Sequence, residues 1–74
     1  MTYEHFVYSP DVDTVAGAYQ QAGYVVAVHD GLVLVYSDYT EDHRAVIQAI
    51  TAEHGATYDG GGMYVGPLPH STDN

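Results

Sequence analysis

Positive charge is nearly absent from this chain of 74 residues. Arg44 is its one Lys or Arg residue, and ten Asp and Glu residues bring the formal net charge to −9. Proteins that bind DNA or RNA directly use Lys and Arg to displace counterions from the phosphates. We therefore expect no direct binding to nucleic acid or to anionic membranes. A compact anion is instead steered towards basic surfaces, although acidity can also serve solubility alone.

Cysteine and long apolar runs are also missing. Without cysteine there are no disulfides and no thiolate metal ligands. The longest apolar stretch, residues 24–28, is far too short to span a bilayer, and the N-terminus lacks the basic and apolar regions of a signal peptide. We expect a cytoplasmic protein without membrane association. Its length suits one domain, over residues 1–68, followed by a flexible tail over residues 69–74.

Motifs for catalysis and for metal binding are lacking as well. The five histidines show no compact ligand spacing, which leaves open only a site assembled from distant positions. The glycine run 60–62 has no lysine to meet a phosphate. Ser9, Ser37 and Ser71 sit in cap, strand-end or tail contexts, which do not suggest a nucleophile. We expect no enzymatic activity, no metal and no cofactor.

Residues that typically start and end helices and strands are easy to recognise along the chain. Aromatic and β-branched residues over 3–8 predict a strand. A helix then follows, with Ser9 as its cap, Pro10 at its first position and Gly23 at its end. Residues 24–29 and 32–37 predict two strands, and Asp30-Gly31 between them is a strong signal for a two-residue hairpin.

The second half of the chain repeats this pattern. Thr40 opens a helix that Gly55 ends, and its expected buried stripe is Val46, Ile47 and Ile50. Residues 56–58 and 63–65 predict a last strand, interrupted at 59–62 by a turn or a bulge. The order β-α-β-β-α-β predicts an α+β domain of the ferredoxin-like kind, with a four-stranded antiparallel sheet and both helices on one face. This fold hosts many functions and selects none.

Alternation along the hairpin carries a first indication of function. One side of it is all valine and suits burial beneath the helices. The other side would then present apolar side chains to solvent, namely Val25, Leu32, Leu34 and Tyr36. Because exposed apolar patches usually mark interfaces, we expect this face to bind a second copy or a partner, unless the register differs.

Carboxylates and tyrosines carry the second indication. Eight tyrosines are many for a chain of this length, and tyrosine is enriched at interfaces. Carboxylates can stand in for phosphates while tyrosines pack where bases pack. The candidate contacts with a partner are Asp11, Asp13, Asp30, Asp38, Glu41, Asp42, Asp59, Tyr36 and Tyr39. Asp38, Glu41 and Asp42 form the best cluster, and the sequence leaves open whether Asp11 and Asp13 adjoin it.

The segment His54-Gly55-Ala56-Thr57-Tyr58-Asp59-Gly60 resembles the ribonuclease E inhibitor family RraB. In that family a helix is followed by a Gly-x-x-Tyr-Asp-Gly stretch that enters the last strand of a ferredoxin-like domain. Gly61 stands where the family pattern has tryptophan, and the chain is shorter than typical members. The resemblance implies an acidic, non-enzymatic protein that restrains a nuclease. In size and charge the chain is also similar to small acidic phage proteins that block CRISPR complexes or mimic DNA.

Together these observations predict a non-enzymatic acidic protein that inhibits a nuclease, or another nucleic-acid-binding machine, by occupying its basic surface. The alternative is a small homodimeric interaction module without mimicry. Ionic strength separates the two, because binding through mimicry weakens steeply as salt is added.

Overall fold

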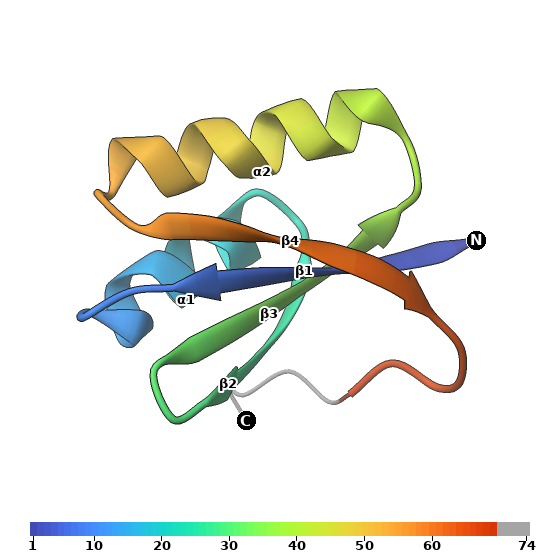
Figure 1. Cartoon of the computed structure of the whole chain (residues 1–74), viewed down its shortest axis with the longest axis horizontal. Coiled ribbons are helices and arrows are strands. Elements are labelled where there is room, and N and C mark those ends of the chain that lie inside the picture. Colours follow the sequence, from blue (N-terminus) through green and yellow to red (C-terminus); the bar gives the residue numbers. More distant parts are fainter. Residues whose placement is uncertain (70–74) are drawn as a thin grey trace.

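A computed structural model of the chain describes residues 1–69 and shows an α+β domain (Figure 1). Its elements are β1 (Thr2–Tyr8), α1 (Val12–Gln21), β2 (Val25–His29), β3 (Leu32–Asp38), α2 (Glu41–Glu53) and β4 (Thr57–Tyr64). The four strands form one antiparallel sheet in the order β2-β3-β1-β4. The order of elements and strands confirms the expected ferredoxin-like arrangement. The tail expected over residues 69–74 lies, apart from Pro69, outside the described residues.

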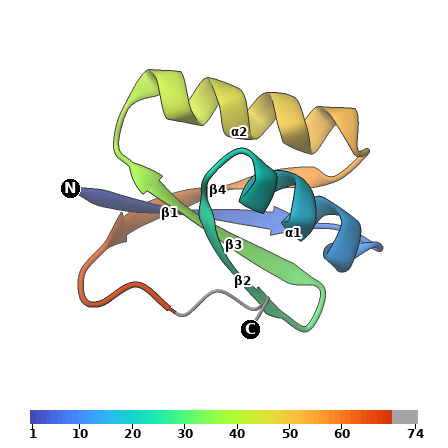
Figure 2. The same ribbon diagram turned by 180° about the vertical axis from the view of Figure 1, so that it is seen from behind.

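The core lies between the sheet and the two helices (Figure 2). Fully buried valines of all three neighbouring strands β2, β3 and β1 meet Val15 and Tyr19 of α1 and Ile47 of α2. The Tyr19 hydroxyl pairs with Thr51 of α2, whose own hydroxyl donates to the Ile47 carbonyl at 2.7 Å. This contact satisfies the polar atoms that the helices bury between them.

The β2–β3 hairpin matches its prediction. Asp30 and Gly31 have φ of 51° and 81°, which is the pair of positive angles that a type I′ turn requires. Val26 pairs with Val35 and Val28 with Val33, and this valine side faces the helices as expected. The register of the apolar residues on the opposite face is thereby fixed.

The start of α1 differs from the prediction. Ser9 does not cap this helix: its hydroxyl accepts from the Asp11 backbone amide at 3.0 Å, and Asp11 is the N-cap residue. The Asp11 carboxylate accepts from both the Thr14 amide (3.4 Å) and the Thr14 hydroxyl (2.8 Å). Because a carboxylate can hold two donors of the first turn, it is the stronger cap, and the helix begins two residues later than expected.

The α2 helix is capped as predicted, and of its expected buried stripe Ile47 and Ile50 contact the core whereas Val46 does not. The Thr40 hydroxyl accepts from the His43 amide at 3.2 Å, and Gly55 follows the helix with φ of 66°. Ile47 is fully buried, whereas Val46 is 44% exposed and Thr51 takes its place in the core. Val46 was expected inside because it is apolar, but it lies on the side of the helix that turns away from Ile47 and Thr51.

The glycine run 60–62 does not interrupt the last strand. β4 continues through it, and two residues, Asp59 and Gly60, lie opposite the single residue Phe6 of β1. This is a β-bulge, one of the two arrangements that the sequence left open. Gly60 takes a φ of 83°, which a glycine adopts without strain.

Candidate functional site

The acidic residues at the two helix starts lie at opposite ends of the sheet. β1 pairs with β3 from Thr2 opposite Asp38 to Tyr8 opposite Leu32. Asp38 and the α2 start therefore lie at the end where β1 begins, whereas the α1 start lies at the end where β1 finishes. The patch around Asp11 and Asp13 does not adjoin the cluster of Asp38, Glu41 and Asp42.

At the end of the sheet where β1 finishes, the start of α1 and the hairpin turn bring carboxylates together. Asp11 and Asp13 are exposed on the first turn of α1, and Asp30 is exposed in the hairpin turn. The Ser9 amide donates to the Gly31 carbonyl at 3.4 Å, so the hairpin turn lies beside the segment that leads into α1. All three carboxylates also have local structural roles or positions, as a cap, a first-turn residue and a turn residue.

At the end of the sheet where β1 begins, Glu41 and Asp42 occupy the first turn of α2, shortly after Asp38 and Tyr39. Negative charge is favourable there because of the helix dipole. Arg44 lies in the same turn, and a hollow of about 180 Å³ is lined by Tyr39, Thr40, Glu41 and Arg44. The Tyr39 ring is 56% exposed and stacks on Tyr3 with the ring centres 4.9 Å apart. This end combines charge with an accessible aromatic ring.

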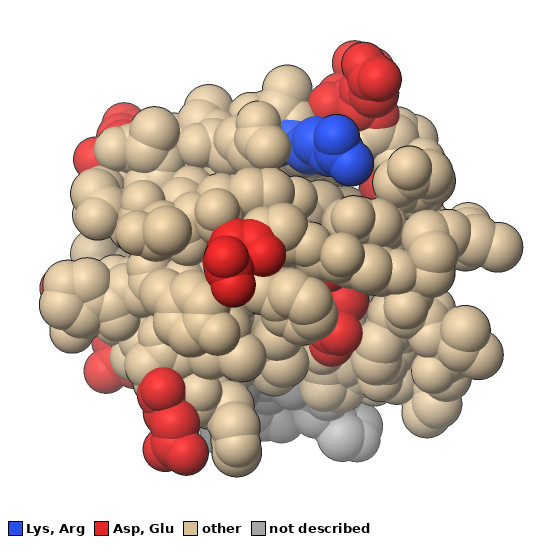
Figure 3. All heavy atoms as spheres, viewed as in Figure 1, with Lys and Arg blue, Asp and Glu red and all other residues tan. Residues whose placement is uncertain are grey.

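The carboxylates do not form one stripe. Asp59 is exposed near the start of β4, on the edge of the sheet opposite the β2–β3 hairpin. In the space-filling view the acidic groups are distributed over the visible face, and the one Arg side chain lies at the position of α2, the helix to which it belongs (Figure 3). Among residues 1–69 no carboxylate forms an ion pair with Arg44 or a histidine within 4 Å. The chain therefore presents a dispersed negative potential, with three exposed carboxylates at each end of the sheet.

The sheet face opposite the helices is apolar, as predicted, but Tyr36 is not exposed on it. Tyr36 retains only 6% of its exposure because its ring packs edge-on against Tyr64, with centres 4.9 Å apart. Its hydroxyl donates to Glu4 at 2.7 Å. Burial, together with the Glu4 carboxylate, raises the pKa of Tyr36. The prediction missed this because the Tyr64 and Glu4 contacts come from strands distant in sequence.

The rest of that face is half-buried. Val25, Leu32 and Leu34 keep part of their exposure, as does Phe6, which pairs with Leu34. Tyr8, opposite Leu32, is 47% exposed. Sequence reasoning did not select Phe6 or Tyr8, although the alternation of β1 around the buried Val7 would have placed both on this face. The accessible apolar part therefore extends over β1 as well as the hairpin.

A buried hydrogen-bond chain links three strands on the helix side of the sheet. His5 is 2% exposed, with Nε2 2.9 Å from the Ser37 hydroxyl and Nδ1 2.8 Å from the Tyr58 hydroxyl. The Ser37 hydroxyl donates to the Asp38 carbonyl at 3.0 Å, so it accepts from Nε2–H, and Nδ1 then accepts from Tyr58. Desolvation by burial, with smaller contributions from Arg44 and His43, lowers the pKa of His5 to about 4.

These two hydrogen bonds and its burial explain why His5 is a neutral core residue. With its proton on Nε2, His5 donates to Ser37 and is not placed to act as its base. The arrangement was missed from the sequence, although His5 lies in register with Val7 on the buried side of β1. Alternation would have placed its side chain inside, but its partners Ser37 and Tyr58 come from other strands.

The remaining histidines do not converge either. His43 accepts or donates at Nδ1 with the Tyr24 hydroxyl at 2.9 Å, whereas His29 and His54 are exposed at strand and helix ends. Over residues 1–69, no three His, Cys, Asp or Glu side chains come close enough to hold a metal ion. Neither helix in that range has the length and apolar character needed to cross a membrane. His70 and Ser71 lie outside the described residues.

Comparison of the chain with known protein families, with curated proteins and with solved structures finds no match. The resemblance to the RraB family and to phage inhibitors therefore stays a prediction.

Proposed function

We propose that this chain is a non-enzymatic acidic protein that inhibits a nuclease, or another nucleic-acid-binding machine, by occupying its basic surface. One observation carries the proposal. Eight carboxylates are exposed, and none of them has an ion-pair partner within the described part of the chain; they are Asp11, Asp13, Asp30, Asp38, Glu41, Asp42, Glu53 and Asp59. Because the chain supplies almost no cation of its own, the cations that complement these groups must come from a partner or from salt.

Capture and competition test the proposal together. The immobilised chain is incubated with an extract of its native host, and the retained proteins are eluted with stepped salt and identified by mass spectrometry. We expect a nucleic-acid-binding protein that elutes as salt screens the interface, and that no longer binds its own nucleic acid when the chain is present. A captured protein that holds nucleic acid and this chain simultaneously would refute the proposal.

Neutralising the cluster of Asp38, Glu41 and Asp42 should weaken this complex more than neutralising the carboxylates at the opposite end of the sheet. The variant Asp38→Asn/Glu41→Gln/Asp42→Asn removes three charges while keeping side-chain shape. Exposed ion pairs contribute about 0.2–1 kcal/mol each, so we expect affinity for the captured partner to fall by roughly threefold to 150-fold. The melting temperature should fall only slightly, since the N-cap Thr40 is retained.

A matched control removes three charges at the opposite end of the sheet. In Asp11→Asn/Asp13→Asn/Asp30→Asn the cap and the positive-φ turn position are both held by asparagine, which suits each of them. Isothermal titration at low salt compares the two variants. Equal losses of affinity would show that only total charge matters and that the cluster around Asp38 has no special role.

The second candidate is a homodimeric interaction module. It is favoured by the partly exposed apolar side chains on the sheet face opposite the helices. Two chains of charge −9 repel each other, so self-association through this face should increase with salt, which is opposite to the behaviour of an acidic inhibitor. Sedimentation at low and at high salt measures this. Under this candidate Tyr8→Ser, on the face, should reduce the dimer, whereas Tyr39→Ser, equally accessible but off the face, should not. A monomer under all conditions would remove the candidate.

A further inference from the structure

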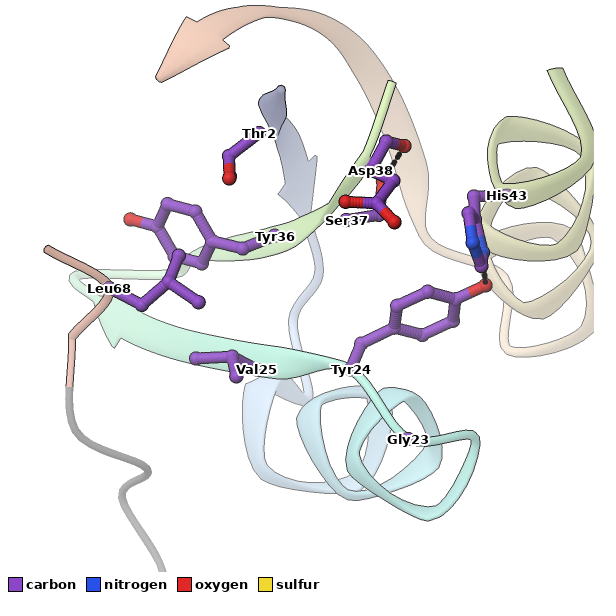
Figure 4. Close-up of a pocket in the computed structure, with 9 residues that line it drawn as sticks. All are labelled: Thr2, Gly23, Tyr24, Val25, Tyr36, Ser37, Asp38, His43 and Leu68. Atoms are coloured by element: carbon purple, nitrogen blue, oxygen red, sulfur yellow. Dashed lines mark hydrogen bonds between the residues drawn. The ribbon is translucent and has the colours of Figure 1, made fainter. Parts of the chain in front are cut away.

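A second hollow lies at the end of the sheet where β2 begins and β3 ends (Figure 4). Its volume is about 240 Å³. Figure 4 shows Tyr36, Val25 and Leu68 on one side of it and the Tyr24–His43 pair on the other, with the Asp38 carboxylate between them. Pockets for small molecules usually hold about 300–1,000 Å³, so this one suits a single side chain better than a whole ligand.

The aromatic walls of this hollow are fixed before anything binds. The Tyr36 ring is held by its hydrogen bond to Glu4 and by the edge of the Tyr64 ring. The Tyr24 hydroxyl is bonded to His43 Nδ1 at 2.9 Å, and the two rings meet edge-on with centres 5.6 Å apart. Because these rings are already ordered, a bound side chain would not have to immobilise them.

Within residues 1–69, the carboxylate of the hollow has no Lys or Arg beside it. Asp38 is exposed, and the sole Arg of the chain, Arg44, lines the other hollow with Tyr39 and Glu41. A carboxylate beside tyrosine rings attracts a cation both through its charge and through the negative faces of the rings. Val25 and Leu68 add apolar surface on which an aliphatic stem can pack.

We propose that this hollow receives an arginine side chain from the basic partner, with Asp38 accepting from the guanidinium group. Arginine fits better than lysine because its planar guanidinium stacks on aromatic rings and bonds a carboxylate through two N–H groups. The inference rests on the proposed function and sharpens it. Within the acidic set, Asp38 then makes a directed contact inside a pocket, whereas the other carboxylates act through the summed field.

A capped tripeptide tests the pocket without the partner. The ¹⁵N-labelled chain is titrated at low salt with acetyl-Gly-Arg-Gly-amide, and with the same peptide carrying citrulline, which has nearly the shape of arginine but no charge. We expect amide shift changes concentrated at Val25, Ser37 and Asp38 with the arginine peptide, and none with citrulline. Asp38→Asn should weaken the apparent affinity about tenfold, because a charge-assisted hydrogen bond is lost.

Asp30→Asn is the matched control, since it removes the same charge at the opposite end of the sheet and asparagine tolerates the positive φ of that position. It should leave peptide binding unchanged. Shift changes spread evenly over the surface, equal weakening in both variants, or no response to the arginine peptide would each overturn the pocket assignment. The proposed function is judged separately by displacement of nucleic acid from the captured partner, so either can fail without the other.

Discussion

The Gly61→Ala variant is expected to lose about 3 kcal/mol of unfolding free energy, the upper part of the usual range for overpacking. A Cβ atom at Gly61 would lie 2.2 Å from the Glu4 carbonyl oxygen and 2.8 Å from Cε2 of the Tyr3 ring. The Tyr3 ring can move, but the carbonyl cannot. It belongs to β1, which pairs with both β3 and β4, so shifting it would disturb two ladders.

Gly62→Ala is the matched control in the same strand. A Cβ atom there would meet nothing within 4 Å, and the residue does not have a positive φ. We expect its unfolding free energy to change by less than about 1 kcal/mol, because alanine also stiffens the unfolded chain. Urea unfolding followed by circular dichroism gives both values from the midpoints. Equal midpoints for the two variants would show that β4 moves away from β1 at little cost.

Local features of the fold could be predicted because each depends on neighbouring residues. Asp30-Gly31 specifies a turn with two positive φ angles, and that turn determines the valine register of the hairpin. Thr40 and Gly55 mark the ends of α2 for similar reasons. The start of α1 was misplaced because Ser9 and Asp11 can both cap, and only the geometry of the chain decides between them.

The candidate site was less predictable because it depends on contacts between distant strands. Whether Tyr36 is exposed depends on Tyr64 and Glu4, and no local pattern shows that these three meet. The separation of the two acidic ends follows from the β1–β3 register, which a sequence pattern does not show before the topology is known. Asp38 was selected for its charge alone. The tyrosines beside it are Tyr36 of β3 and Tyr24, which directly precedes β2, and their proximity became apparent only in the assembled fold.

Stability should decrease as the pH falls from about 6.5 to about 4, and His5 should account for about 3 kcal/mol of that decrease. Burial lowers the pKa of His5 to about 4 in the folded chain, whereas an unfolded histidine titrates near 6.5. Between pH 6.5 and pH 4 the unfolded state therefore binds a proton on this histidine that the folded state does not bind. The contribution is fully present above pH 6.5 and is lost by pH 4, at about 1.4 kcal/mol per pH unit.

Other charged groups of the chain also affect its stability as the pH changes, so the prediction is read from a difference between variants. Carboxylates gain protons as the pH falls, which also relieves the mutual repulsion of a chain with a net charge of −9. His5→Gln keeps all of these groups and removes only the buried imidazole. It should be less stable at pH 7.5, since the hydrogen-bond chain between Ser37 and Tyr58 is broken, but its stability should depend less on pH.

Urea midpoints measured at intervals between pH 7.5 and pH 4 provide the comparison. The wild-type curve should fall more steeply than the His5→Gln curve between pH 6.5 and pH 4, and the two should become parallel outside that window. His29→Gln, which changes an exposed histidine at the end of β2, should leave the wild-type slope intact. Parallel curves for wild type and His5→Gln throughout would mean that His5 is protonated as readily in the fold as outside it. The prediction that burial keeps His5 neutral in the folded chain down to about pH 4 would then be wrong.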